Sequence, residues 1–285
     1  IILAHSYQNI EIDQVADYVG DSLYLSRKAK DTNADIIVFA GVYFMAQTAK
    51  IISPEKKVLL PDINAGCLMA DMINLHQTVD FKNQYPGLPV VCYINSTAEV
   101  KAECDICCTS SNAVEIVKSL NSKRVLFVPD ANLGKWVESR LDGVEVITYN
   151  GNCPVHHNVT VSDIMHARKK YPDAKILIHP ECKPEVSALG DYVGSTSGII
   201  NYVKRSNEKR FVIVTEKGVA ERLERDYPDK EFIIIKDNML CDSMKLTTLE
   251  EILYALERER HEITLDDSVR ELSSNCIERM LRVSK

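Results

Sequence analysis

Short apolar runs alternate with amphipathic stretches along most of the chain. Apolar runs of about four to eight residues that end at polar or turn residues are typical of buried strands. Helical spacing in the intervening stretches, for example at 45–52, predicts that strands and helices alternate. Such alternation indicates an α/β fold with parallel sheets covered on both faces. The strongest runs predict strands at 1–4, 36–40, 57–60, 90–93, 125–128, 144–148, 176–179, 211–214 and 232–235.

One sequence pattern occurs three times. The segments DYVGDS, DICCTS and DYVGST begin at Asp17, Asp105 and Asp191 and align without gaps. Their offsets of 88 and 174 residues also align the apolar runs IILAHSYQ, VVCYINST and ILIHPECK. Because independent landmarks agree on one period, we interpret the chain as three copies of one α/β unit, each with an additional short strand.

A cysteine follows the last strand of each unit. These cysteines are Cys67, Cys153 and Cys241, at spacings of 86 and 88 residues. Length alone suggests about two domains, but the repeat predicts three homologous α/β domains around a pseudo-three-fold axis. We expect the α/β repeats at 1–67, 68–153 and 154–241, followed by a C-terminal helical segment at 242–285.

The pattern becomes helical after Cys241. Thr247 and Glu250 have the spacing of a capping box, which predicts that a helix of about three turns begins there. Farther on, apolar residues recur at intervals of three and four, which predicts a closing amphipathic helix. Its apolar face would carry Val269, Leu272, Cys276, Met280 and Val283.

The composition is that of a globular chain, since 45% of its 285 residues are hydrophobic and 26% are charged. The net charge of -7 argues against nucleic-acid binding, which needs a basic surface. No apolar run reaches the roughly 18 residues of a membrane span. The chain begins at Ile1 in a strand-like run, so we expect a short preceding segment, no signal peptide and a cytoplasmic location.

The nine cysteines are an odd number without a secretory signal, which argues against a disulfide framework. Reduced thiols are the better interpretation, some of them as metal ligands. Cys67, Cys153 and Cys241 belong to no local metal motif, but one thiolate from each repeat would meet at the axis. Three thiolates suit a 4Fe–4S cluster with one open iron or a catalytic zinc with an open position, and cubane geometry favours the cluster.

The other cysteines fit this role less well. Cys182 is the strongest rival, but the other repeats have no cysteine at the equivalent position. Cys107 and Cys108 fall in the short strand of the second repeat, where packing explains them. Cys92 and Cys276 lie in apolar patterns, and we expect them in the core.

The first strand of each repeat ends in two polar residues separated by one position. Such residues lie on one face of an extended chain, and parallel sheets bind ligands beyond the carboxyl ends of their strands. A single pair would be explained by satisfied core residues. Three equivalent pairs instead favour a shared cavity suited to proton transfer. The pairs are His5 with Tyr7, Tyr93 with Asn95, and His179 with Glu181.

A hydroxyl residue stands at the start of a predicted helix in each repeat: Ser22, Ser110 and Thr196. Helix N-termini carry unpaired N–H groups and partial positive charge, so three of them together would bind carboxylate and phosphate groups. Ser and Thr also cap helices routinely, and capping is compatible with anion binding.

Many short motifs in one order resemble quinolinate synthase, the iron–sulfur enzyme of de novo NAD biosynthesis. That family is similar in having three α/β domains about a pseudo-three-fold axis and a 4Fe–4S cluster at their junction. Some members have a CxxCxxC run at the last ligand, whereas Cys241 stands alone here. The motifs cover essentially the whole chain: LAHSYQ, GDSLYLSRKA, GVYFMA, PDINAGCLMAD, YINSTAEVKA, CTSSNAVEIV, PDANLGKWV, NCPVHH, HPEC, YVGSTSGI and CDSMKLTTLEEILYAL.

The resemblance implies a carbon–carbon bond-forming transferase. It would condense iminoaspartate with dihydroxyacetone phosphate to quinolinate and release phosphate and water. L-Aspartate oxidase or aspartate dehydrogenase would supply the iminoaspartate. The cluster ligands would be Cys67, Cys153 and Cys241. The implied pocket residues are His5, Tyr7, Ser22, Tyr93, Asn95, Ser110, His156, His179, Glu181 and Thr196.

Within that pocket, Tyr7 and Glu181 are the candidates for proton transfer, while His5, His179 and Tyr93 would position carboxylate and carbonyl oxygens. Two alternatives belong to other classes of protein. One is an iron–sulfur redox sensor or carrier, which needs no polar cavity. The other is a metal-free binding protein for small molecules. A radical enzyme that uses S-adenosylmethionine is disfavoured, since the sequence has no CxxxCxxC run.

Overall fold

The computed structural model describes residues 1–284. Within that range the strands form three separate four-stranded sheets, and every strand pair is parallel. The three sheets share one topology: the first strand of each unit lies between the second and the third, and the fourth lies beyond the third. The predicted α/β fold is confirmed.

Each predicted strand is present, and a short second strand completes each sheet. The first sheet contains β1 (Ile2–His5), β2 (Tyr18–Gly20), β3 (Ile36–Ala40) and β4 (Lys57–Leu59). The second contains β5 (Val90–Tyr93), β6 (Ile106–Cys108), β7 (Arg124–Val128) and β8 (Glu145–Thr148). The third contains β9 (Lys175–Ile178), β10 (Tyr192–Val193), β11 (Arg210–Val214) and β12 (Glu231–Ile234).

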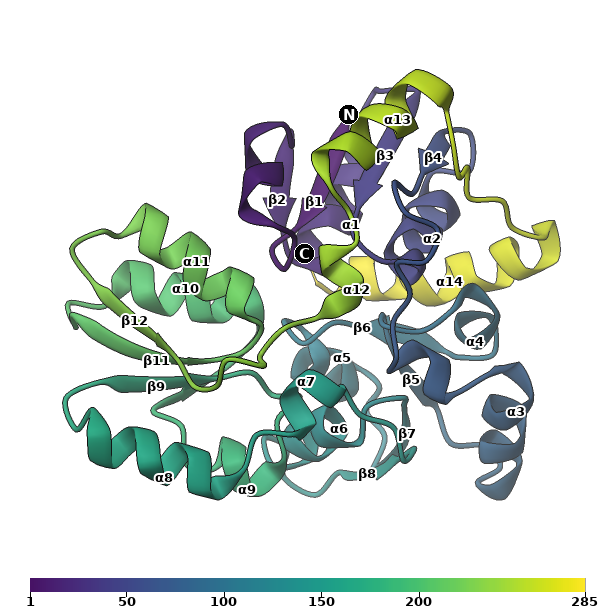
Figure 1. Ribbon diagram of the computed structural model, residues 1–285. Helices are drawn as coiled ribbons and strands as arrows, with labels where there is room; N and C mark the ends of the chain where they lie inside the picture. The colour runs from purple at the N-terminus through teal and green to yellow at the C-terminus, as the bar shows by residue number, and fades with distance from the viewer. Residues whose placement is uncertain (285) are drawn as a thin grey trace.

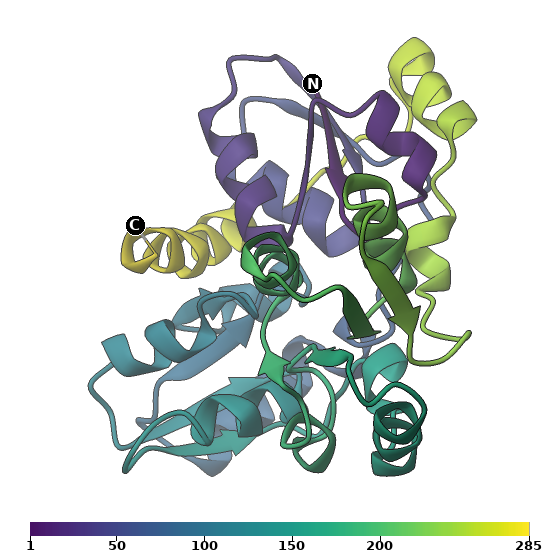
Figure 2. The same ribbon diagram turned by 90° about the vertical axis from the view of Figure 1, so that its left-hand side faces the viewer.

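Helices surround the three sheets, which appear as separate bodies around the centre of the molecule in both ribbon views (Figure 1, Figure 2). Two short 3-10 helices are η1 (Ile10–Gln14) and η2 (Ala70–Met72). The α-helices are α1 (Ser22–Asp31), α2 (Tyr43–Ile52), α3 (Leu75–Gln84), α4 (Ala98–Ala102), α5 (Ala113–Ser119), α6 (Ala131–Glu138), α7 (Pro154–His157), α8 (Val161–Lys170), α9 (Pro184–Ser187), α10 (Thr196–Arg205), α11 (Lys217–Asp226), α12 (Asp242–Lys245), α13 (Leu249–Arg258) and α14 (Asp267–Val283).

The central strands are buried on both faces, which explains their almost continuous apolar sequences. All four residues of β5, with the sequence VVCY, are buried. In β11, with the sequence RFVIV, only the first residue is not fully buried. Because helices cover both faces of a parallel sheet, these strands need no polar face. Their polar residues therefore gather at the strand ends.

The predicted capping box at Thr247 and Glu250 is wrong by one residue. Thr248 is the cap of α13, and its side chain accepts a hydrogen bond from the Glu251 N–H. Thr247 is instead fully buried, and its carbonyl accepts from Asn9 Nδ2 at 3.2 Å. This distant contact holds Thr247 in the preceding turn, so the helix begins after it.

The closing helix α14 is present, but one residue of its predicted apolar face is misplaced. Cys276 and Met280 are buried as expected, together with Ser273 and Ile277. Leu272 is 54% exposed. The helix packs against α4 and β6, but Leu272 is exposed, so apolar spacing alone overestimated the buried face.

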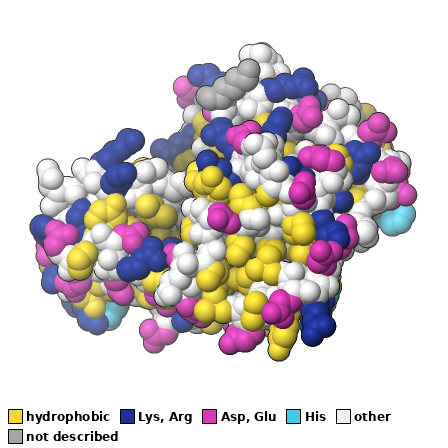
Figure 3. Space-filling view, turned by 90° about the horizontal axis from the view of Figure 1, so that it is seen from above, with side chains coloured by type: hydrophobic (Ala, Val, Ile, Leu, Met, Phe, Trp, Pro, Cys, Tyr) yellow, Lys and Arg dark blue, Asp and Glu magenta, His cyan; other side chains and the backbone are white. Residues whose placement is uncertain are grey.

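The outer surface carries both signs of charge. Viewed from above, acidic and basic side chains are intermixed with apolar ones (Figure 3). Exposed large apolar side chains on α13 include Leu253 and Tyr254. None of the helices in residues 1–284 has the length and hydropathy required to cross a bilayer.

Candidate active site

A cavity with a volume of about 240 Å³ is lined by residues from all three units. Cys67, Cys153 and Cys241 contribute to its wall. Side chains that are far apart in the sequence therefore share one cavity. The ten other residues predicted for the site also line it: His5, Tyr7, Ser22, Tyr93, Asn95, Ser110, His156, His179, Glu181 and Thr196.

The carboxyl ends of the parallel strands bring these groups together. β1 ends at His5, β5 ends at Tyr93, and β9 ends one residue before His179. Each of these strands lies inside its sheet, between two neighbours. The central position leaves only the strand end free to face a ligand, which is the usual binding edge of a parallel sheet.

Glu181 is the centre of a buried hydrogen-bond network. Its Oε1 accepts from the Tyr93 hydroxyl at 2.6 Å, and its Oε2 lies 2.7 Å from His156 Nδ1 and 3.6 Å from His179 Nδ1. Burial raises the pKa of Glu181, but the His179 and His156 rings and the Tyr93 hydrogen bond outweigh it and lower the pKa to about 2. The carboxyl group is therefore ionised at neutral pH.

His5 and His179 have the same hydrogen-bond arrangement in two different repeats. The Tyr7 N–H donates to His5 Nδ1 at 3.2 Å, and the Glu181 N–H donates to His179 Nδ1 at 3.4 Å. Burial lowers the pKa of His5 to about 4 and that of His179 to about 3. Both rings are neutral at pH 7, and since Nδ1 is an acceptor, each ring donates only through Nε2.

The Tyr7 hydroxyl connects the first repeat to the third sheet. It lies 2.9 Å from Thr215 Oγ1 and accepts from Thr196 Oγ1 at 3.0 Å. Thr215 Oγ1 also lies 3.0 Å from His156 Nε2. Burial, together with the charge of Glu181, raises the pKa of Tyr7 well above its usual value. The phenol therefore stays protonated and can act as a donor.

The N-termini of α1 and α10 meet beside the cavity. Ser22 and Thr196 are the first residues of these helices, as predicted, and follow the caps Asp21 and Ser195. Ser111, which precedes α5, has its Oγ 2.8 Å from both Asp21 Oδ2 and Ser195 Oγ. One hydroxyl thus links the corresponding segments of all three repeats.

The prediction that Ser110 begins a helix is wrong. α5 begins at Ala113, and Ser110 lies in the turn that precedes it. Asn112 Oδ1 accepts from the Thr109 N–H at 2.6 Å and lies 3.2 Å from the Thr109 hydroxyl. This side-chain bond closes a turn in competition with the helix. Ser110 nevertheless lines the cavity.

The three cysteines at the cavity differ from most other cysteines in being partly exposed. Burial raises the pKa of Cys67 to about 12 and also raises the pKa of Cys153 and Cys241. An isolated thiolate is therefore disfavoured at each position. A bound cation would offset this cost, so the donor set fits a metal centre.

The distances between possible donor atoms show which residues could bind one shared metal ion. Within residues 1–284, only Cys153, His156 and Glu181 have three donor atoms all within 4.8 Å of one another. Two thiolates on one zinc ion, with bonds of about 2.3 Å, would lie within about 4 Å of each other. Within the described residues, the sulfurs of Cys67, Cys153 and Cys241 do not form such a close set, so they are not arranged around one shared ion.

The remaining cysteines lie away from the cavity wall. Cys182 is fully buried in an apolar cluster of the third unit. Cys107 Sγ and Cys276 Sγ are 3.2 Å apart, in the contact between β6 and α14. Cys92 and Cys108 are also fully buried. The predicted packing of Cys107 and Cys108 and the predicted core positions of Cys92 and Cys276 are confirmed. Cys182, the rival metal ligand of the sequence analysis, is buried away from the cavity.

Comparison with known proteins decides the family. The family model of quinolinate synthetase A protein matches residues 1–282. The chain belongs to the quinolinate synthetase A family. A quinolinate synthase of Alkaliphilus metalliredigens is 50% identical over 283 residues, which cover 99% of this chain and 93% of the relative.

Two further quinolinate synthases show the same extent of similarity. The protein of Thermodesulfovibrio yellowstonii is 47% identical over 281 residues, covering 99% of this chain and 93% of the relative. The protein of Clostridioides difficile is 45% identical over 285 residues, covering 100% and 94%. As a member of the quinolinate synthetase A family, the chain is an enzyme of NAD biosynthesis, and a redox carrier or a binding protein no longer fits.

Sequence analysis of this family member missed several buried polar residues, of which Glu216 lines the cavity. Thr215 and Glu216 directly follow β11, and both are fully buried. Asp130 follows β7 after one residue and is also fully buried. These positions obey the strand-end rule that identified the other site residues. The repeat concealed them, since Gly41 follows β3 in the first unit.

Proposed function

We propose that this member of the quinolinate synthetase A family condenses iminoaspartate with dihydroxyacetone phosphate in the central cavity and forms quinolinate, phosphate and water. One observation carries the assignment to this cavity: strand-end polar groups and one cysteine from each repeat line the same space. A supplier such as L-aspartate oxidase or aspartate dehydrogenase would deliver the iminoaspartate, and the reaction would take place in the cytoplasm. The repeat boundaries at residues 67, 153 and 241 belong to the same proposal.

The cofactor of the proposal is a 4Fe–4S cluster held by Cys67, Cys153 and Cys241. Two observations support it: the three cysteines line one cavity, and they are partly exposed. A cubane with three cysteine ligands leaves one iron open. When bound, this group would supply a Lewis acid for a substrate hydroxyl or carbonyl oxygen.

The hydroxyls of Ser22, Ser110 and Thr196 are proposed to hold the carboxylate and phosphate groups of the substrates. All three line the cavity, and two of them are the first residues of helices. The unpaired N–H groups of those helix starts add donors and partial positive charge. Asn95 lies on the same cavity wall and adds a further polar group.

Proton transfer is assigned to Tyr7 and Glu181. The Tyr7 phenol is protonated and hydrogen-bonded to Thr215 and Thr196, so it can donate a proton and be resupplied from neighbouring hydroxyls. Glu181 is ionised, so it can accept a proton when the enamine form of iminoaspartate attacks the triose and when the ring closes.

Neutral imidazoles position the reacting oxygens in this proposal. His5 and His179 would donate through Nε2 to carboxylate and carbonyl oxygens. His156 lies between Glu181 Oε2 and Thr215 Oγ1 and orients both groups. Tyr93 donates to Glu181 at 2.6 Å and keeps that carboxylate in place.

The test is an anaerobic assay of pyridine-2,3-dicarboxylate formed from oxaloacetate, ammonia and dihydroxyacetone phosphate, after reconstitution with iron and sulfide. Tyr7→Phe and Glu181→Gln should each lower turnover by about 10²- to 10⁴-fold while iron and sulfide contents stay unchanged. Tyr254→Phe, on the exposed face of α13, is the matched control and should leave turnover unchanged. Near-normal turnover in either site variant would remove that residue from the mechanism.

Metal content tests the cofactor separately. Substituting Ala for any one of Cys67, Cys153 and Cys241 should lower the bound iron and sulfide. The rival is a single zinc ion at Cys153, His156 and Glu181, the closely spaced set. Zinc without sulfide, retained in Cys67→Ala and lost in His156→Ala, would support that rival and overturn the cluster.

A further inference from the structure

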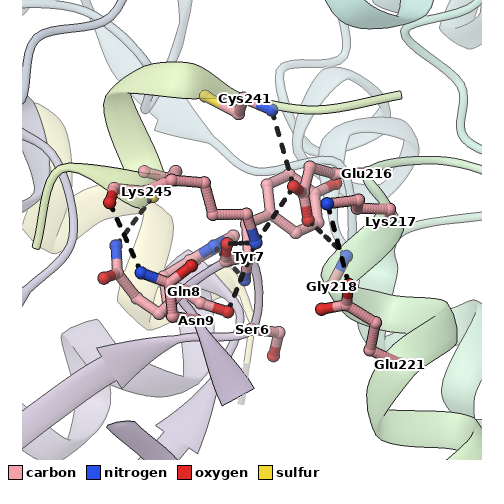
Figure 4. Close-up of polar contacts among 12 residues, drawn as sticks. Ser6, Tyr7, Gln8, Asn9, Glu216, Lys217, Gly218, Glu221, Cys241 and Lys245 are labelled. Atoms are coloured by element: carbon pink, nitrogen blue, oxygen red, sulfur yellow. Dashed lines mark hydrogen bonds and ion pairs between the residues drawn. The ribbon is translucent and has the colours of Figure 1, made fainter. Parts of the chain in front are cut away.

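A buried ion pair lies beside the cavity, and the proposed chemistry does not use it. Glu216 directly follows Thr215 at the end of β11 and is fully buried. Lys245 is the last residue of α12, and its side chain is 14% exposed. Lys245 Nζ lies 3.2 Å from Glu216 Oε1 (Figure 4). A buried pair of this kind is costly unless further hydrogen bonds satisfy both groups.

The further hydrogen bonds of the pair go to the backbone of two site residues. Lys245 Nζ donates to the Tyr7 carbonyl at 2.6 Å and lies 3.4 Å from the Gln8 carbonyl. Glu216 Oε1 accepts a long hydrogen bond of 3.5 Å from the Cys241 N–H. The same ion pair therefore touches the main chain at the proposed proton donor and at the proposed third cluster ligand, as Figure 4 shows.

The pair is tightly enclosed by the start of α11. Glu216 Oε2 accepts from the Gly218 N–H at 2.7 Å. A Cβ atom at Gly218 would lie 2.8 Å from Glu216 Oε2, 3.1 Å from Lys245 Nζ and 3.2 Å from Arg222 Nη1, so that at least one of these groups would have to move. The glycine thus permits a close approach that any other residue would disturb.

A neighbouring pair on the same helix provides a contrast. Lys217 Nζ lies 3.8 Å from Glu221 Oε1, and both side chains are about one-third exposed, at 35% and 36%. Exposed pairs of this type contribute little and bind no other segment. The Glu216–Lys245 pair differs in burial, in distance and in its contacts with two distant parts of the chain.

We infer that Glu216 and Lys245 are positioning residues that hold the backbone at Tyr7 and the backbone at Cys241 in fixed positions at the cavity wall. The inference rests on the proposed function only in what it says about iron retention. Without Lys245, the buried carboxylate loses its partner and the Tyr7 carbonyl loses its donor. The segments that carry Tyr7 and Cys241 should then loosen together, although no reacting group has been removed.

Hydrogen exchange on the iron-free full chain tests this directly. In Lys245→Met, peptides covering residues 5–9 and 238–244 should exchange about tenfold faster than in the unmodified chain, which corresponds to about 1.4 kcal/mol of local opening. Lys217→Met is the matched control and should leave both peptides unchanged. Wild-type exchange rates in both peptides of Lys245→Met would overturn the inference.

Iron release from the reconstituted protein is the second measurement. Substitution of groups that support metal ligands costs about 10- to 100-fold in metal affinity, so Lys245→Met should release iron to an added chelator faster by a similar factor. Glu216→Gln removes the other charge of the pair and should produce the same effect. If Lys245→Met does not fold, Glu216→Gln decides, and wild-type exchange and release rates in that variant would overturn the inference.

The two measurements separate this inference from the proposed cofactor. If the unmodified chain takes up no iron and sulfide, the cluster proposal fails, while hydrogen exchange still decides whether the pair holds both segments. If the unmodified chain takes up the cluster and Lys245→Met retains it with unchanged exchange and release rates, the cluster stands and the positioning role fails.

Discussion

The first two sheets and the third sheet are attached to the molecule in different ways. Apolar residues from one face of the first sheet and from the second sheet form one continuous core, which includes Leu3 of β1, Val91 of β5 and Met280 of α14. Helix α14 packs against α2, α4 and β6, and so joins the two sheets. The third sheet has two apolar clusters of its own, which include Ile176 and Phe211.

Polar contacts provide much of the attachment of the third sheet. Arg222 of α11 is 4% exposed, donates to the carbonyls of Ser6 and Gln8 at 2.7 and 3.0 Å, and forms an ion pair with Asp13. Lys245 binds the Tyr7 carbonyl from the same side. These groups come from segments that lie more than two hundred residues apart in the sequence.

This difference between apolar and polar attachment shows how a cavity can be built from repeats. Apolar contact is non-directional and tolerates small shifts, so it suits the permanent union of two sheets. Hydrogen bonds and ion pairs require defined distances and angles. Polar contacts at the third sheet therefore fix the positions of cavity residues, at the cost of desolvating the charged groups.

The largest effect is expected for Arg222→Met. Removing one partner of a buried pair costs about 3–5 kcal/mol, and here it acts on the attachment of the third sheet. In urea, the far-ultraviolet circular dichroism should begin to change before the fluorescence of Trp136, the single tryptophan, which lies on α6 in the second unit. Arg225→Met removes the exposed member of the same cluster and is the control. Coincident transitions in Arg222→Met would contradict the proposed difference.

Met280→Ala should destabilise the first two sheets together. Met280 is fully buried in their shared core, and truncation of such a side chain costs about 2–5 kcal/mol. The fluorescence and circular dichroism midpoints should both shift to lower urea concentration. Met165→Ala, at a position that is 53% exposed on α8, should leave both midpoints in place. A shift in circular dichroism alone would mean that α14 does not join the sheets.

The pH dependence of the free energy of unfolding tests the lowered pKa of His5, the last residue of β1. Burial lowers the pKa of His5 to about 4, while Asp21 and Glu181 raise it and Arg222 and Lys245 lower it. Between pH 6.5 and 4 the unfolded chain therefore binds more protons than the folded one, and the free energy of unfolding falls as the pH falls. His5 alone contributes up to about 3 kcal/mol over this window.

Urea titrations at pH 7 and pH 4.5 measure this contribution. On acidification, the free energy of unfolding of His5→Gln should fall less than that of the unmodified chain. The difference should be part of the roughly 3 kcal/mol that His5 contributes. His166→Gln, at an exposed position on α8, should retain the full acid sensitivity. Equal acid sensitivity of all three proteins would show that His5 titrates normally when folded.

Ser111→Ala should have the smallest effect. The change removes a hydroxyl that lies 2.8 Å from Asp21 and from Ser195, and one such hydrogen bond contributes about 0.5–1.5 kcal/mol. The circular dichroism midpoint should fall slightly, with no change for the exposed control Ser162→Ala. A loss as large as that of Arg222→Met would place the main attachment of the third sheet at the helix starts instead.

Local sequence was sufficient for the repeated architecture and for the polar strand ends and cysteines of the cavity wall. Strand runs such as 90–93 and 211–214 are apolar over their whole length, so burial on both faces could be predicted without a structure. The similar spacings of Cys67, Cys153 and Cys241, at 86 and 88 residues, and the polar strand ends then indicated a shared cavity. Periodicity carries this information because each repeat folds by the same local rules.

Departures from the local rules for strands and helices could be recognised only in the tertiary structure. Ser110 lies in a turn because Asn112 binds Thr109 locally, a competition that periodicity does not reveal. Thr247 is displaced from the helix cap by Asn9, which lies at the other end of the chain. Neither change alters the fold, but both alter which atoms face the cavity or the core.

The amino-acid sequence determined the three α/β units, the order of their strands and the residues that gather at the strand ends, because hydrophobic periodicity is a local property. The tertiary structure was needed to see that an apolar core joins the first two units and that charged groups attach the third unit to the first. It also revealed the bonds of Thr215 to Tyr7 and His156, and of Glu216 to Lys245. Such contacts join positions that are distant in the chain, and their geometry depends on how complete units pack, which no local pattern encodes.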